Sequence, residues 1–324
     1  MEFGLYLNQY HDARSSFTFD HLFEQLDVME ATGFDLAAAG QRHFYDDGFF
    51  DPWSTLTAMA SHAETLTIMA NILILPVYHP IHVAERIVSI DHLTSGHSRF
   101  GVSLGYRESE LENFGVPMPA RVDRFTESLT IIKRLLGGDR FDHDGDHFVF
   151  DDAFVRPGPI QQPRPPLEGG GSAPAAIRRA ASRCDGFTAA ITDPEVLADD
   201  IELYRETLKA AGASSDDGHV TIMVDGYVAD SREAAKDALD PYALDLHEQY
   251  IKWGNPEFTG RPTFEDVEAG MVLGSPQAVA GQIETYQDLG VDTFILRTQF
   301  PGMSQVTALA GVRRFGEDVI PLIS

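Results

Sequence analysis

The chain has 324 residues and a formal net charge of −26, from 50 acidic and 24 basic residues. This charge argues against binding to nucleic acid or to an anionic membrane surface. No run of about 18 uncharged apolar residues occurs, and no basic leader with a cleavage site precedes the first apolar run, so we expect a cytoplasmic protein that does not span a membrane. Only 4 of the basic residues are lysine, and this balance is typical of adaptation to high salt.

Strand and helix patterns alternate along nearly the whole chain. Short apolar runs predict buried parallel strands, and segments with helical spacing of apolar residues separate them. The predicted strands are 3–8, 34–40, 67–76, 99–105, 167–172, 185–190, 220–230 and 291–297, and the predicted helices include 19–33, one starting at Pro52, 79–93, 120–136, 172–183, 193–212 and 231–249. This order predicts one domain over residues 1–324, a (β/α)8 TIM barrel with insertions, in preference to a doubly wound open sheet.

Two segments break the alternation. Residues 139–166 combine a predicted hairpin with an Asp-Gly turn and a proline-rich run, and we interpret them as an insertion before strand five. Residues 248–272 carry Trp253 among glycines and prolines. Long irregular segments in barrels are often lids or binding loops, so we predict a lid here, with a packed surface excursion as the alternative.

A barrel of this class places its function at the carboxyl ends of its strands. The segments at these ends are QRHF (41–44), ILPVYHP (74–80), SLGYRESE (103–110), GGGS (169–172) and RTQFPG (297–302). Gly170, Gly171 and Ser172 precede a helix whose amino terminus can bind an anion, so they are candidates for a phosphate site. No dinucleotide fingerprint or Walker loop is present, which predicts a mononucleotide-like cofactor.

Four histidines, at positions 79, 82, 92 and 97, crowd one segment and raise the question of a metal. Their spacing fits neither a metalloprotease helix nor a zinc pattern of cysteine and histidine. We therefore predict no metal site.

The order of these motifs resembles the bacterial luciferase-like flavin-dependent monooxygenases. The resemblance runs from FGLYL near the start, through QRHF, MANILILPVYHP, SLGYRESELENFG and GGGS, to LGSPQAVAGQIETYQDLGVDTFILRTQFPG at 273–302. It implies that the protein uses reduced FMN, supplied by a separate flavin reductase, to activate oxygen as a flavin hydroperoxide. The implied substrate is a small organic, partly hydrophobic molecule, and the implied assembly is a homodimer.

The resemblance also assigns residues. Ala70 and Asn71 occupy the place where the family has a nonprolyl cis peptide beneath the flavin ring. Ser103, Gly105 and Tyr106 match the strand-four loop, and Gly170, Gly171 and Ser172 match the phosphate loop. Apart from the resemblance, Phe44, Trp253 and Arg297 are candidates for the substrate and lid region, because Phe44 and Arg297 lie at strand ends and Trp253 lies in the segment 248–272.

Two departures from the family pattern bear on the chemistry. Luciferases carry two adjacent histidines after strand two, the first acting as a base, whereas this chain has Arg42 and then His43. Either His43 takes the role of the base, or Arg42 stabilises an anionic flavin or peroxide. The luciferase arginine of strand four is replaced by Leu104, so Arg107 or Arg178 would meet the phosphate charge.

Other functions stay open at this point. A related oxidoreductase could use the deazaflavin coenzyme F420 for hydride transfer; such enzymes typically carry Gly-x-Gly-Glu after strand four, whereas this chain reads Leu104-Gly105-Tyr106-Arg107, which favours FMN. Salt adaptation favours the deazaflavin. A noncatalytic flavin-binding homologue is a third possibility, and a metal-dependent barrel hydrolase lacks its ligand pattern.

Overall fold

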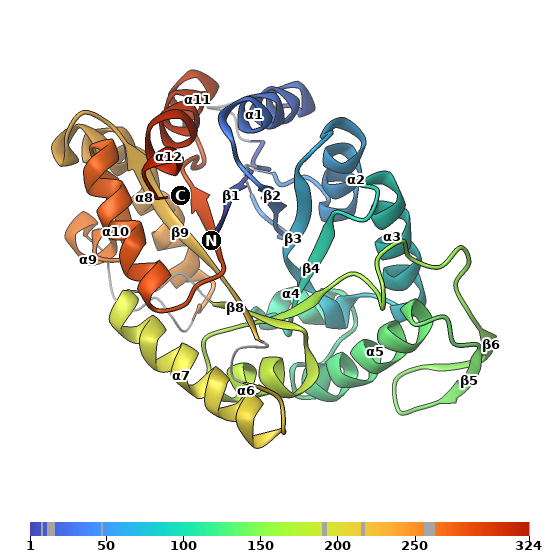
Figure 1. The fold of residues 1–324 in the computed structure, drawn as a ribbon. Coiled ribbons are helices and arrows are strands. Elements are labelled where there is room, and N and C mark those ends of the chain that lie inside the picture. The colour runs from blue at the N-terminus through green and yellow to red at the C-terminus, as the bar shows by residue number, and fades with distance from the viewer. Residues whose placement is uncertain are drawn as a thin grey trace.

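The computed structural model describes residues 1–7, 9–11, 17–46, 48–189, 193–214, 218–255 and 263–323. Within these residues, eight parallel strands close into a barrel in the order β1-β2-β3-β4-β7-β8-β9-β11, because β11 pairs with β1 and β8 pairs with β9 (Figure 1). The strands are β1 (Glu2–Tyr6), β2 (Leu36–Ala39), β3 (Thr67–Ile74), β4 (Ser98–Ser103), β7 (Leu167–Gly170), β8 (Gly186–Ala189), β9 (His219–Val228) and β11 (Thr293–Arg297). The predicted fold class is confirmed.

The barrel strands are buried on both faces. All of the residues of β2, β8 and β11 are buried, and so are most of those in β3. This explains why the strands appear in the sequence as continuous apolar runs rather than as alternating patterns. The inner side chains fill the barrel, so a ligand can enter only where the strands end.

Helices form an outer ring around the strands (Figure 1). The longer ones are α1 (Phe19–Thr32), α2 (Pro52–His62), α3 (Pro80–Leu93), α5 (Arg121–Leu136), α6 (Pro174–Arg183), α7 (Pro194–Ala210), α8 (Arg232–Lys252), α10 (Pro276–Asp288) and α11 (Gln305–Arg314), and the short ones are α4 (Glu108–Asn113), α9 (Phe264–Glu268) and α12 (Ile320–Ile323). Residues at the helix ends explain where some of these helices begin and end. Gly33 ends α1 with a φ of 87°, and Asp51 caps α2 by accepting a hydrogen bond from the Ser54 amide at 2.8 Å.

Two additions interrupt the barrel pattern. Strands β5 (Phe141–Asp144) and β6 (Val149–Ala153) form an antiparallel hairpin between α5 and β7, outside the barrel sheet. In the segment 248–272, α8 continues to Lys252, and β10 (Met271–Gly274) adds to the carboxyl half of β9. Much of this segment is therefore regular structure, which the sequence pattern did not predict. Residues 256–262 of the predicted lid lie outside the described residues.

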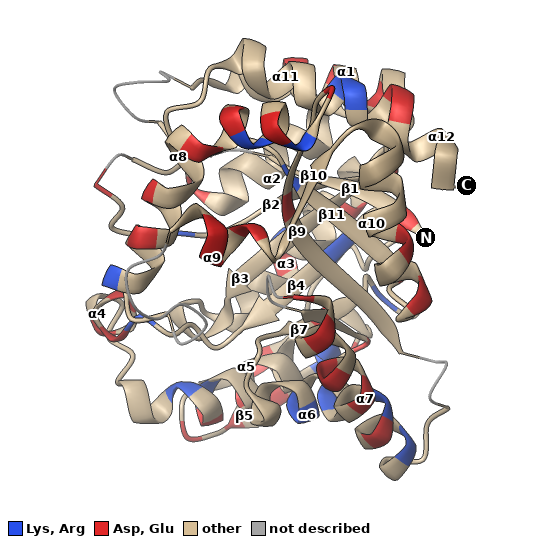
Figure 2. Cartoon of the chain, turned by 90° about the vertical axis from the view of Figure 1, so that its left-hand side faces the viewer, with Lys and Arg blue, Asp and Glu red and all other residues tan. Residues whose placement is uncertain are grey.

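The charges are distributed unevenly between the core and the outside. Figure 2 shows acidic residues spread over the outer helices, whereas the strands carry few charges. Among the described helices, none is both long enough and apolar enough to cross a membrane.

Candidate active site

A pocket of about 540 Å³ lies at the carboxyl ends of the strands, within the range of about 300–1,000 Å³ that is usual for small-molecule sites. Its wall comes from the ends of β1, β3, β4, β7, β8 and β9, from the loop after β2, and from the last turn of α8 and the residues that follow it. Of the residues assigned from the sequence, those that line it are Arg42, Asn71, Ser103, Gly105, Tyr106, Gly170, Gly171, Ser172 and Trp253.

One end of the pocket is built from backbone. Strand β7 ends at Gly170, Gly171 and Ser172 follow, and α6 begins at Pro174. The helix cap is Ala173, which has no side-chain acceptor for the first amides of α6. A Cβ atom on Gly170 would overlap Ile72 Cδ1, so a side chain there would require Ile72 to move. These features leave an open helix amino terminus facing the pocket, where an anion is favoured.

The arginine at this end is one that the sequence did not single out. Arg121, the first residue of α5, lines the pocket; its Nη1 donates to the Met118 carbonyl at 2.8 Å. Its Nε is buried and has no hydrogen-bond partner among the described residues. Arg178 is exposed and does not line the pocket. Arg121 therefore replaces Arg178 as the candidate cation for a phosphate.

The second candidate, Arg107, is already engaged. Its Nη1 donates to the His43 carbonyl at 2.8 Å and lies 3.5 Å from Glu110 Oε1, and its guanidinium carbon lies 4.2 Å from the Trp253 ring centroid. Arg107 thus connects three segments at the pocket wall rather than offering a free charge.

The floor of the pocket is shifted by one residue from the predicted position. Asn71 and Ile72 line the pocket, and the peptide bond between them is cis. Ala70 is fully buried and belongs to the hydrophobic core. The assignment of Ala70 to the floor is therefore corrected to Ile72. The pairing of β3 with β4 shifts register between Ala70 and Leu73, so regular strand alternation does not hold at these residues.

The two residues of the strand-two loop point to different places. Arg42 lines the pocket, whereas His43 lies behind the rim, with its Nε2 2.7 Å from Gln41 Nε2 and its ring 4.7 Å from the ring of Phe114. Burial and the nearby Arg107 lower the pKa of His43. Phe44 is 57% exposed and lies at the same rim, 5.8 Å from Phe114 between ring centroids.

Glu110 contributes the carboxylate of the pocket wall. It accepts a hydrogen bond from the His43 amide at 2.9 Å, and it is 3% exposed. Burial raises the pKa of Glu110 despite this hydrogen bond and the charge of Arg107. Burial thus favours the protonated form of this carboxyl more than water does.

Beneath the opposite end of the pocket lies a fully buried ion pair. Arg297 at the end of β11 and Asp225 on β9 are both 0% exposed, and His247 Nε2 lies 3.3 Å from the Asp225 carboxylate. Arg297 Nη1 also donates to the hydroxyl of Tyr250, on α8, at 2.8 Å. Arg297 does not line the pocket and reaches it through Tyr250, which does.

Arg42 contacts the same tyrosine. Its Nη2 donates to the Tyr250 hydroxyl, and its guanidinium lies among four aromatic rings, those of Tyr10, Phe49, Tyr250 and Trp253. No carboxylate pairs with Arg42 in the described part of the chain. Neither Tyr250 nor Asp225 was identified from the sequence, although an aspartate inside the apolar run of strand seven is a signal for a buried pair.

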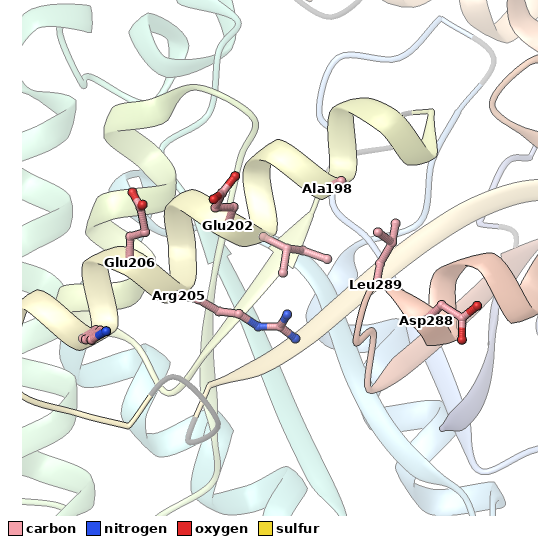
Figure 3. A pocket seen from close by; sticks show the side chains of 8 residues that line it. Ala198, Glu202, Arg205, Glu206, Asp288 and Leu289 are labelled. Atoms are coloured by element: carbon pink, nitrogen blue, oxygen red, sulfur yellow. The ribbon is translucent and has the colours of Figure 1, made fainter.

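A second hollow, of about 420 Å³, lies on the outside of the barrel between α7 and the end of α10 (Figure 3). Its lining mixes charges of both signs, and Arg205 donates to the Gly290 carbonyl across it at 3.3 Å. No strand end lines it, so it lies away from the end of the barrel at which function is expected. Within the described ranges, no group of three or more potential metal ligands is present.

The fold and the pocket define a (β/α)8 barrel of the kind that carries an active site at the carboxyl ends of its strands. The chain belongs to the luciferase-like monooxygenase family, whose model matches residues 1–293. This confirms the predicted family. It also agrees with the predicted class of enzyme, a flavin-dependent monooxygenase that uses oxygen.

Several relatives are named as monooxygenases. The chain is 27% identical to the FMNH2-dependent dimethylsulfone monooxygenase of Pseudomonas putida, over 96% of this chain and 90% of that protein. It is 24% identical to limonene 1,2-monooxygenase of Rhodococcus erythropolis, over 89% and 77%. It is 22% identical to the oxygenase component of the flavin-dependent trigonelline monooxygenase of Acinetobacter baylyi, over 94% and 90%.

Solved structures share the fold at low sequence identity. Monooxygenase RslO1 of Streptomyces bottropensis superposes with a TM-score of 0.87 at 19% identity, covering all of both chains. An F420-dependent secondary alcohol dehydrogenase gives 0.82 at 19% identity, over 100% of this chain and 99% of that one. The oxygenating constituent of 3,6-diketocamphane monooxygenase of Pseudomonas putida, in complex with FMN, gives 0.82 at 16% identity, over 100% and 99%. Both predicted cofactors, FMN and F420, thus occur among proteins with this fold.

Proposed function

We propose that the protein is the oxygenase of a two-component system that uses reduced FMN and oxygen to oxidise a small, partly hydrophobic organic substrate. One observation carries this proposal: a single pocket has an anion site of backbone amides and Arg121 at one end and an aromatic wall at the other. FMN has this distribution of chemistry, with a phosphate tail and a flat apolar ring. The relatives named as FMNH2-dependent or flavin-dependent monooxygenases support it.

The chain's own residues would hold and orient the cofactor. The amides at Gly171 and Ser172, the α6 terminus and Arg121 would bind the phosphate. Asn71 and Ile72 would lie under the ring, and Ser103, Gly105 and Tyr106 beside it. When bound, reduced FMN would supply the electrons that activate oxygen. His43 would hold Gln41 in place through its 2.7 Å contact, and Arg42 would stabilise negative charge.

We extend the proposal to the cellular setting. A separate flavin reductase would supply reduced FMN, as the name "oxygenase component" of one relative suggests. A cytoplasmic location, a homodimer and a high-salt habitat belong to the same proposal; the net charge of −26 supports the last of these.

Cofactor titration tests this function. The purified protein is titrated without oxygen with reduced FMN, oxidised FMN and reduced F420, and oxygen is then admitted in the presence of candidate substrates. We expect reduced FMN to bind most tightly and substrate oxidation to depend on oxygen. Tight binding of F420 with hydride transfer in the absence of oxygen would replace this function with the deazaflavin alternative. Flavin binding without any turnover would support the noncatalytic homologue.

The segment 248–272 is proposed to close over the pocket. Trp253, Gly254 and Asn255 already line it, and Trp253 packs against the guanidinium of Arg107. Closure would exclude water from the reaction. Limited proteolysis checks this: FMN should slow cleavage within 248–272, whereas identical cleavage with and without FMN would contradict a lid.

A further inference from the structure

The Tyr250 hydroxyl lies between two guanidinium groups in the wall of the pocket. Arg297 Nη1 donates to it at 2.8 Å, and Arg42 Nη2 donates to it from the other side. Tyr250 is 7% exposed and lines the pocket. Two charge-assisted donors on one oxygen favour the phenolate over the phenol, because each donor binds an anionic oxygen more strongly.

The charges of the surrounding cluster do not balance when Tyr250 is neutral. Asp225 neutralises Arg297 through two contacts, at 2.5 and 2.7 Å. Arg42 has no carboxylate partner among the described residues, and its Nη1 is buried there without any hydrogen-bond partner. One positive charge is left over in a buried environment, which is costly. A phenolate at Tyr250 would compensate it.

Several titratable or charged groups face Tyr250 from the elements packed around it. They are Tyr6 on β1 and Tyr10 after it, Arg42 after β2, Tyr106 after β4, Asp225 on β9, His247 on α8 and Arg297 on β11. Among these tyrosines, only Tyr250 accepts hydrogen bonds from both arginines in the described contacts. Arginine charges also act on Tyr6, Tyr10 and Tyr106, but burial outweighs them and raises the pKa of all three.

We propose that Tyr250, held by Arg42 and Arg297, is the general base of this enzyme and takes a proton from the bound substrate. This inference rests on the proposed function and adds a substrate class: a molecule with an acidic hydrogen on oxygen, or on carbon next to an electron-withdrawing group. The phenolate oxygen forms a bond to the hydrogen, and the electron pair of the broken bond stays on the substrate. Tyr250 leaves this step as a neutral phenol.

The direction of the pKa agrees with this role. Burial alone would raise the pKa of Tyr250, but the charges of Arg297 and Arg42 outweigh it and lower the pKa below its usual value. Burial raises the pKa of both Tyr6 and Tyr10. Within this cluster, the pKa of Tyr250 is therefore lowered, whereas those of Tyr6 and Tyr10 are raised.

A spectroscopic titration tests the ionisation without cofactor or substrate, so it is independent of the proposed function. The ultraviolet absorbance of phenolate is followed against pH in the wild type, Tyr250→Phe and the matched control Tyr10→Phe. We expect one tyrosine to ionise below the usual range in the wild type and in Tyr10→Phe, and this step to be absent from Tyr250→Phe. Arg42→Gln should move the step to higher pH. A wild type without an early step, or a step that persists in Tyr250→Phe, would overturn the proposal.

The catalytic role is tested by turnover at varied pH once a substrate is in hand. Tyr250→Phe should lower kcat by roughly 100-fold or more, abolish the acidic limb of the pH profile, and change the affinity for reduced FMN by less than about threefold, because the ring stays in place. A full acidic limb in Tyr250→Phe would refute the base role even if FMN binding and oxygenation are established. Loss of FMN binding in the wild type would refute the proposed function instead.

Discussion

Arg297 and Asp225 are register partners on the adjacent parallel strands β11 and β9, and their side chains form a two-contact ion pair that is fully buried. The strands fix both backbones, so the pair is preorganised rather than assembled by long mobile side chains. Arg297 is thereby held directly beneath Tyr250. The pair thus connects Tyr250, in the wall of the pocket, to the barrel sheet.

Breaking the pair should destabilise the fold. Asp225→Asn removes the charge but keeps the shape, leaving Arg297 buried and uncompensated, and we expect a loss of about 3–5 kcal/mol in the free energy of unfolding. The matched control is Asp230→Asn, because Asp230 pairs with Arg314 but is 88% exposed, and it should change stability by less than about 1 kcal/mol. Chemical denaturation measures both, and equal losses would contradict the importance of burial.

The same carboxylate predicts a pH dependence of stability. Burial alone would raise the pKa of Asp225, but the charge of Arg297 outweighs it and the pKa falls to about 2. The unfolded value is about 3.9, so the contribution is complete above about pH 4 and is lost as the pH falls towards 2. Unfolding measured from pH 5 downwards should show the wild type and Asp225→Asn converging. Parallel curves would show that Asp225 is not the group that titrates.

Arg121 should bind the phosphate of the cofactor. Arg121→Gln removes the charge at the α6 end of the pocket and should weaken reduced FMN binding by about 10-fold or more, since a hydrogen bond to a charged group contributes about 1.5–3 kcal/mol. Arg178→Gln is the control, because Arg178 is exposed and outside the pocket. Equilibrium titration should leave this control close to wild type. If the two variants lost affinity equally, a general charge effect would explain the result.

Gly170 should accept a methyl group only if Ile72 moves. A methyl group there would overlap Ile72 Cδ1, and Ile72 lines the pocket, so Gly170→Ala should change the shape of the pocket and weaken FMN binding, at a stability cost of about 0.5–1.5 kcal/mol. Gly281 on α10 has open space around its Cα, and Gly281→Ala should stabilise the protein by about 0.4–1 kcal/mol. Thermal unfolding with and without FMN compares them. Unchanged FMN affinity in Gly170→Ala would place the cofactor elsewhere.

Salt should stabilise the protein. With a net charge of −26, carboxylates on the outer helices repel one another, and ions screen this repulsion over a Debye length of about 10 Å at 0.1 M and about 3 Å at 1 M. The free energy of unfolding should therefore rise from low salt to molar KCl. NaCl at the same ionic strength should give a similar rise. A flat or falling curve would contradict adaptation to high salt.

The sequence predicted the parts of the site that depend on local chemistry. Gly170, Gly171 and Ser172 could be singled out because a glycine run before a helix, at the end of a barrel strand, suits the binding of an anion. The floor was misplaced by one residue, since an apolar run does not reveal which side chains point inward. Arg178 was a candidate because it follows the glycine run in the chain, whereas Arg121, on another helix, was not considered.

The amino-acid sequence by itself determined the alternation of buried strands and amphipathic helices, and hence the parallel barrel and the edge at which its function lies. These features follow from hydrophobic periodicity and helix termini, which are local properties. The tertiary structure alone decided that Arg42, Asp225, Tyr250 and Arg297 meet. They come from a loop, a helix and two strands that are far apart in sequence, and the charge balance of such a cluster exists only when the closed barrel brings them together.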